Sequence, residues 1–152
     1  MQQSTTQCFV HIFHINIEDL YNKLIDPYFV PDVFFQKSKF VSMKRQTNMA
    51  DEGNEITLEI TADYVFTYTV ENTINQANFK SFTHRCINAH TMFASFIITW
   101  NFHWDSINQV TLFEIIITIT DTLYKNSVLS YFSNHYQKSF KNVEEYFRNK
   151  TM

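Results

Sequence analysis

The chain has 152 residues and a formal net charge of −3, which suits a single domain over residues 1–152 and argues against a nucleic-acid partner. No apolar run reaches the length of about 18 residues that crosses a bilayer, and residues 1–7 lack the features of a secretory signal. The two cysteines, Cys8 and Cys86, show no metal-binding or disulfide spacing, so we expect reduced, part-buried thiols.

The first part of the chain predicts one strand followed by two short helices. Residues 6–14 have strand character, and Asn16 is a good N-cap for a helix over residues 17–25. Pro27 ends that helix because a residue that precedes proline disfavours the helical conformation. A second short helix is expected at residues 31–36.

The middle of the chain alternates apolar and polar residues, which is typical of antiparallel strands with one wetted face. Strands are expected at residues 40–47, 55–61, 64–74 and 79–88, and then in a hairpin over 92–120 with a polar break at 105–108. The first arm of the hairpin carries an apolar stripe at its even positions, which are Met92, Ala94, Phe96, Ile98, Trp100, Phe102 and Trp104.

Residues 127–150 predict a long amphipathic helix whose apolar side chains recur every three or four positions. Such a helix needs an apolar partner, and the apolar face of the sheet is the one large enough. The fold class is therefore α+β. We expect a strongly curved antiparallel sheet of seven strands wrapped around the C-terminal helix, with the two short helices between the first two strands.

Several segments, in this order, resemble the START-like superfamily with its helix-grip fold, and within it the mitochondrial coenzyme Q-binding protein family. They are DPYFVP (26–31), KSKFV (37–41), LEITADYVFTYTVENTI (58–74), MFASFIITWNF (92–102) and the closing helix SYFSNHYQKSFKNVEEYFRNK (130–150). The chain departs from the family at Asp32 and Val33, where Trp and Cys are usual, and it lacks a glycine before Trp100.

The resemblance implies a carrier or chaperone for a lipophilic small molecule, ubiquinone above all or another lipid. The ligand would lie between the sheet and the C-terminal helix, and no metal would be needed. The resemblance also implies a mitochondrial location on the matrix side of the inner membrane, and a respiratory complex or the membrane surface as partner. We expect residues 17–36 to form a gate, with contact side chains at Tyr28, Phe29, Val30 and Phe34.

The inward-facing residues allow two interpretations. They form either a solid core or the lining of an apolar cavity into which a few polar side-chain groups point. The expected lining residues are Phe66, Tyr68, Phe82, His84, Phe96, Trp100, Phe102, Phe113, Ile115, Phe132, Tyr136 and Phe140. Tyrosine and tryptophan side chains can supply these polar groups, and His84, which alone among the histidines has an inward parity, could hydrogen-bond a ligand carbonyl. The six histidines show no chelating pair, so we expect isolated polar or part-buried side chains.

Two further functions remain open from the sequence. The chain could be a structural accessory subunit of a mitochondrial respiratory complex that uses the fold for docking. It could also be a cyclase or hydrolase, although the interior offers only His84 and tyrosines as acid or base groups. Cys86 and His84 are neighbours on one strand face, yet burial explains this pair better than catalysis does. We expect no enzymatic activity.

Overall fold

The computed structural model describes the backbone of residues 4–26, 29, 42–45, 56–61, 64–89, 95–120 and 125–150. It describes side chains at residues 5–26, 29, 70–85, 97–118, 133–134 and 136–150. The elements are β1 (Ser4–Phe13), α1 (Ile17–Leu24), β2 (Ser42–Arg45), β3 (Ile56–Thr61), β4 (Tyr64–Asn75), β5 (Phe79–Ala89), β6 (Ser95–Asp105), β7 (Val110–Thr120) and α2 (Lys125–Lys150).

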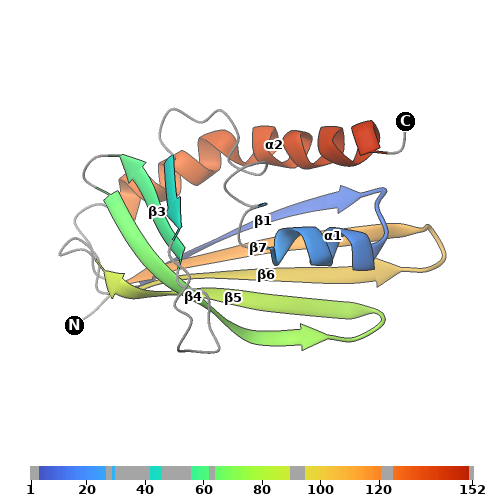
Figure 1. Ribbon diagram of the computed structural model, residues 1–152, viewed down its shortest axis with the longest axis horizontal. Coiled ribbons are helices and arrows are strands. Elements are labelled where there is room, and N and C mark those ends of the chain that lie inside the picture. The colour runs from blue at the N-terminus through green and yellow to red at the C-terminus, as the bar shows by residue number, and fades with distance from the viewer. Residues whose placement is uncertain are drawn as a thin grey trace.

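The strands of the described chain form one antiparallel sheet in the order β1-β7-β6-β5-β4-β3-β2. Neighbours along the chain therefore pair with each other, except that the first strand joins the last, with Phe13 opposite Thr111. The long helix α2 runs along one side of the sheet next to β1, and α1 lies near the β6–β7 hairpin (Figure 1). The α+β class, the antiparallel sheet and the C-terminal helix predicted from the sequence are confirmed.

The elements expected from the sequence agree closely with those observed, and most of their ends differ by two residues or fewer. The first strand ends at Phe13, so His14 lies in the bend that follows it. The second short helix, expected at 31–36, lies outside the described residues. Within the described part of the chain, no helix is long and apolar enough to cross a membrane.

Two polar side chains fix the ends of elements in the way that their residue types favour. The Asn16 side chain accepts a hydrogen bond from the Glu18 backbone N–H at 2.8 Å and so caps α1. Asp105 accepts hydrogen bonds from the backbone N–H groups of Ile107 and Asn108 in the β6–β7 turn. These hydrogen bonds to the charged form, chiefly those from Asn108, lower the pKa of the Asp105 carboxyl.

Replacing Asn16 with alanine should lower the free energy of unfolding by about 1 kcal/mol, because the first turn of α1 loses its side-chain acceptor. The matched control is Asn22→Ala, since Asn22 is exposed on the same helix and does not cap it. Chemical denaturation of both variants measures the difference. Equal stability of the two variants would show that the cap contributes nothing.

The interior lies between the sheet and the two helices. The sequence pattern predicts the part between the sheet and α2, but not the contribution of α1. On β6, Ile98, Trp100 and Phe102 are buried, whereas His103 is exposed and Asn101 is half-buried on the other face. The described core also contains the following residues: Phe13, Ile17, Leu20, Tyr21, Leu24, Phe29, Phe82, Phe113, Ile115, Ile117, Phe140 and Val143. The even-position stripe therefore faces inward wherever its side chains are described.

Candidate functional site

The structure places most of the expected cavity residues in the interior. Tyr136 is half-buried and packs against the core, and the others that are described are buried, namely Phe82, His84, Trp100, Phe102, Phe113, Ile115 and Phe140. The remaining expected residues, Phe66, Tyr68, Phe96 and Phe132, have side chains outside the described part. In strand register, Phe66 and Phe96 lie beyond the observed core, away from the β6–β7 turn.

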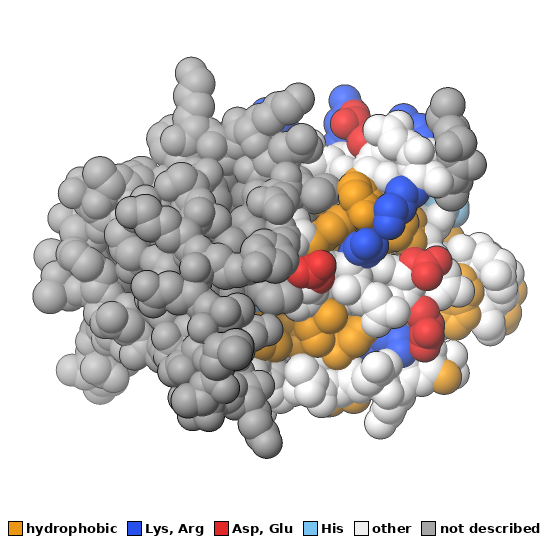
Figure 2. All heavy atoms as spheres, in the orientation of Figure 1, with side chains coloured by type: hydrophobic (Ala, Val, Ile, Leu, Met, Phe, Trp, Pro, Cys, Tyr) orange, Lys and Arg blue, Asp and Glu red, His pale blue; other side chains and the backbone are white. Residues whose placement is uncertain are grey.

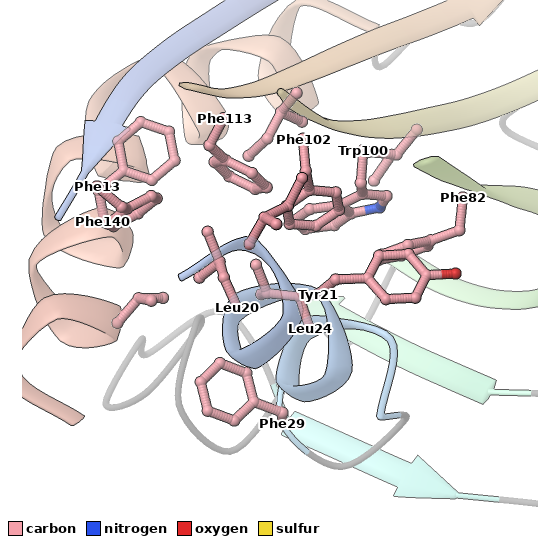
Figure 3. Close-up of a cluster of buried hydrophobic side chains, with 14 of the residues drawn as sticks. Phe13, Leu20, Tyr21, Leu24, Phe29, Phe82, Trp100, Phe102, Phe113 and Phe140 are labelled. Atoms are coloured by element: carbon pink, nitrogen blue, oxygen red, sulfur yellow. The ribbon is translucent and has the colours of Figure 1, made fainter. Parts of the chain in front are cut away.

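The buried rings touch one another directly across the space between the sheet and α2. The Trp100 ring lies 5.9 Å from Phe113, centroid to centroid, and Phe102 lies 5.1 Å from Phe113. Phe113 in turn meets Phe140 of α2 edge-on at 5.7 Å. These separations are typical of packed aromatic pairs, so this half of the interior is a solid core (Figure 3).

The helix α1 closes the interior on a second side. Leu20, Tyr21 and Leu24 are at most 4% exposed and point from α1 toward the rings of the sheet (Figure 3). The Tyr21 ring meets Phe102 edge-on at 5.5 Å. The part of the expected gate that the structure describes as α1 therefore contributes an apolar face to the core.

The gate residue Phe29 is also placed differently from our expectation. The sequence suggested an exposed contact residue, but Phe29 is only 5% exposed. Its ring meets Tyr146 edge-on at 4.9 Å and lies 6.4 Å from Phe147, so it anchors this segment to α2. Burial of an aromatic ring removes a large apolar area from water, which explains the inward position. The other expected contact residues, Tyr28, Val30 and Phe34, lie outside the described residues.

His84 and Trp100 form a buried, hydrogen-bonded pair beside the Phe82 ring. The Trp100 Nε1–H donates to Nδ1 of His84 at 3.2 Å, and both side chains are at most 4% exposed. Burial lowers the pKa of His84 from 6.5 to about 3, so the ring is neutral at physiological pH. Because Nδ1 accepts a hydrogen bond, the ring proton lies on Nε2.

A lysine that the sequence pattern did not single out is buried where β5 meets α1. Lys80 is 2% exposed, and its Nζ donates to Glu18 Oε1 at 3.4 Å and to Asn75 Oδ1. The ammonium group also lies 5.5 Å from the centroid of the Tyr21 ring. The inward parity of position 80 could have indicated its burial. Lys80 therefore joins β5 to α1 and lies against the Tyr21 ring at the edge of the aromatic core.

A second pair that the sequence analysis missed joins β1 to α2. His11 Nε2 lies 2.5 Å from Glu144 Oε1, and the His11 ring stacks on Phe140 at 4.9 Å. We expected isolated polar or part-buried histidines. His11 is part-buried, with a side chain 33% exposed, but it is not isolated, because it pairs with Glu144, whose side chain is 39% exposed. Glu144 follows Val143 on the inner edge of α2, which was the one signal available. Beside this pair lies a surface cavity of about 440 Å³.

The outer face of the sheet mixes polar side chains with the exposed apolar side chains of Val10, Ile12 and Leu112, and it carries no buried acid–base pair within the described residues. Ser81 donates to Asn101 at 2.7 Å, Asn101 donates to Glu114 at 3.0 Å, and the Cys8 thiol donates to Glu114. Cys8 is exposed rather than part-buried. Desolvation where the thiol contacts the protein, and then the neighbouring Glu114 carboxylate, raise the pKa of the Cys8 thiol, which argues against a reactive thiolate. Cys86 has a side chain outside the described part.

Comparison with known proteins identifies the fold and leaves the family open. No family model matches the chain, and no curated protein matches it in sequence. Solved structures match over nearly the whole chain. Ginseng major latex-like protein 151 from Panax ginseng has a TM-score of 0.63 at 14% identity, covering 94% of this chain and 97% of its own.

Two bacterial structures give a similar result. A START superfamily protein from Mycobacterium smegmatis has a TM-score of 0.62 at 8% identity, with 95% of this chain and 97% of that chain covered. The Mll3558 protein from Rhizobium loti has a TM-score of 0.62 at 7% identity, with 95% and 98% covered. The chain therefore has the helix-grip fold that START-like and major latex-like proteins share.

Proposed function

We propose that the protein binds a lipophilic small molecule, most specifically ubiquinone, between the sheet and α2. The helix-grip fold supports this proposal because it places the apolar face of one antiparallel sheet opposite one long helix. In the proposal the sheet of seven strands curves strongly around α2, and the ligand occupies the half beyond the solid core. In strand register, Phe96 of β6 lies opposite Ile119 of β7 in that half.

One observation carries the proposal, namely the neutral His84 among aromatic rings at the end of the solid core. A lipophilic carbonyl needs apolar walls and one hydrogen-bond donor. Trp100 fixes the His84 tautomer with its proton on Nε2, and the pKa of about 3 keeps the ring neutral at physiological pH. In the proposal the ligand oxygen is added to the contacts that His84 already makes in the protein. A neutral donor suits an uncharged quinone oxygen better than the carboxylate of a fatty acid, which would leave a buried charge unpaired.

The expected result is that a soluble ubiquinone analogue, decylubiquinone, quenches the fluorescence of Trp100. The chain has two Trp residues, so Trp104→Phe leaves Trp100 as the single reporter. Quenching should saturate with ligand, and His84→Phe should weaken it by about tenfold because the hydrogen-bond donor is lost. The control is Phe79→Leu, because the half-buried Phe79 ring packs against the exposed His103 ring and not against the buried rings of the interior.

Native mass spectrometry of protein isolated from membranes separates the general proposal from the specific one. A bound mass equal to ubiquinone supports both, and a different bound lipid retains the carrier role but contradicts ubiquinone. Protein that carries no lipid and gives no saturable quenching contradicts both. The proposed partners are a respiratory complex and the inner membrane surface, on the matrix side of the mitochondrion, where the carrier would extract and deliver its ligand.

A second candidate function is a structural subunit of a respiratory complex. The solid packing of Phe113, Phe102 and Phe140 favours it, because a docking block needs a rigid core and no cavity. Co-migration with a respiratory complex on native gels, in high salt and without bound lipid, would support this function over the carrier. We propose no catalytic role, since a His84 pKa of about 3 makes the imidazole a weak base.

A further inference from the structure

The surface cavity beside the His11–Glu144 pair lies outside the grip interior. It is bordered by the turn after β1, the first turns of α1 and the C-terminal half of α2, which lie side by side (Figure 1). Its volume of about 440 Å³ falls within the range of small-molecule sites. Phe13 and Phe140, which are at most 2% exposed, lie in the core beneath His11.

The charged groups around this cavity have both signs. Asp19 of α1 and Glu144 of α2 contribute carboxylates, and Arg148 of α2 contributes a guanidinium. Within the described residues, no three His, Cys, Asp or Glu side chains converge as a metal ion requires. These charged side chains line a hollow and do not converge on one point. They therefore suit an organic molecule whose positive and negative groups are separate.

The other lining groups define the rest of the ligand. Ile15 and Phe147 provide an apolar wall, and both are half-buried against the core. Asn16 uses its side-chain oxygen to cap α1, so its NH₂ group is the part that can donate to a ligand. His14 is exposed at the rim.

We propose that this cavity binds a zwitterion of the amino-acid type, with an ammonium group, a carboxylate and an apolar side chain. The ammonium group lies between the carboxylates of Asp19 and Glu144. The carboxylate meets Arg148, whose five N–H donors allow a ligand contact in addition to its protein contacts. The apolar side chain lies against Ile15 and Phe147.

His11 is a positioning residue in this proposal. It holds Glu144 Oε1 at 2.5 Å and thereby fixes the rotamer of the carboxylate at the cavity wall. The other oxygen of Glu144 is the one offered to the ammonium group. On the described part of the surface seen in Figure 2, acidic and basic side chains are interspersed rather than gathered by sign. The zwitterion is argued from the lining of the cavity, where Asp19 and Glu144 lie with Arg148.

The test uses one zwitterionic probe and two further probes, each of which lacks one of its two charged groups. They are L-phenylalanine, 2-phenylethylamine, which lacks the carboxylate, and 3-phenylpropanoate, which lacks the ammonium group. In NMR titrations, L-phenylalanine should shift the amide signals of residues 14–19 and 144–148. Each of the other probes should bind about fivefold more weakly, the size expected for one partly exposed charge pair.

Variants then assign each charge to its partner. Glu144→Gln should weaken L-phenylalanine about fivefold and leave 3-phenylpropanoate unchanged, whereas Arg148→Gln should weaken both carboxylate-bearing probes. The matched control is Glu145→Gln, because Glu145 is the exposed neighbour on α2 and does not line the cavity. Equal effects of Glu144→Gln and Glu145→Gln would overturn the site.

Three other outcomes also contradict the proposal. They are equal affinity for all three probes, shifts confined to the core, and no saturable shift for L-phenylalanine. The proposal does not rest on the proposed carrier function, because the cavity is separated from the interior by buried rings. Quinone quenching of Trp100 in the Glu144→Gln variant should therefore match that of the unmodified protein.

Discussion

Replacing Phe113 with alanine should lower the free energy of unfolding by about 3–5 kcal/mol, the usual cost of removing a fully buried ring. Phe113 is 0% exposed and joins the sheet to α2, since its ring meets Trp100, Phe102 and Phe140. The variant leaves a hole at the centre of these contacts, and the packed neighbours cannot move to fill it. Chemical denaturation followed by far-UV circular dichroism measures the loss.

The control for this variant is Ile107→Ala in the β6–β7 turn. Ile107 is 90% exposed, so its truncation should change stability by less than about 0.5 kcal/mol. A Phe113→Ala protein about as stable as Ile107→Ala would mean that the observed core does not hold the sheet and α2 together.

The stability of the protein should depend on pH through His84. Its pKa is about 3 when folded and near 6.5 when unfolded, so below pH 6.5 the unfolded chain binds a proton that the folded protein does not. Stability should therefore fall as the pH drops through this window and be independent of His84 above it. The expected loss is about 2 kcal/mol between about pH 7.5 and about pH 5.

The comparison variant is His84→Gln, because a glutamine side-chain oxygen can accept the Trp100 Nε1–H and does not titrate. Denaturation curves of the two proteins across this pH range isolate the contribution of His84 from that of the carboxylates. Parallel pH profiles for the two proteins would show that His84 is not held neutral by burial.

Sequence periodicity was enough to predict the elements and the faces of the strands. The strict alternation on β6 placed Trp100 and Phe102 inside and His103 outside, and the structure confirms each of these faces. This works because a one-residue change of register would move every apolar side chain of the strand into water. The N-cap at Asn16 was readable for a similar reason, since capping depends on neighbours in the chain.

The contacts between distant elements could not be predicted from sequence periodicity or from local capping residues. Phe29 is buried because α2 returns to meet it, and Lys80 is buried because Glu18 and Asn75 supply oxygen atoms near its ammonium group. Both depend on how the helices dock, which periodicity within one element does not encode. The cavity residues Asp19 and Glu144 come from two helices, so neither gave a local signal of a shared site.

The pairing of β1 with β7 has a consequence for how the chain folds. Ser4 lies opposite Thr120, so β1 cannot pair with β7 until nearly all of the domain has been synthesised. Contacts of such long sequence separation slow folding, because the chain loses much conformational entropy before these contacts form. During synthesis, β1 would therefore emerge from the ribosome with its apolar face uncovered. We expect the β6–β7 hairpin to form early and then to serve as the template that captures β1.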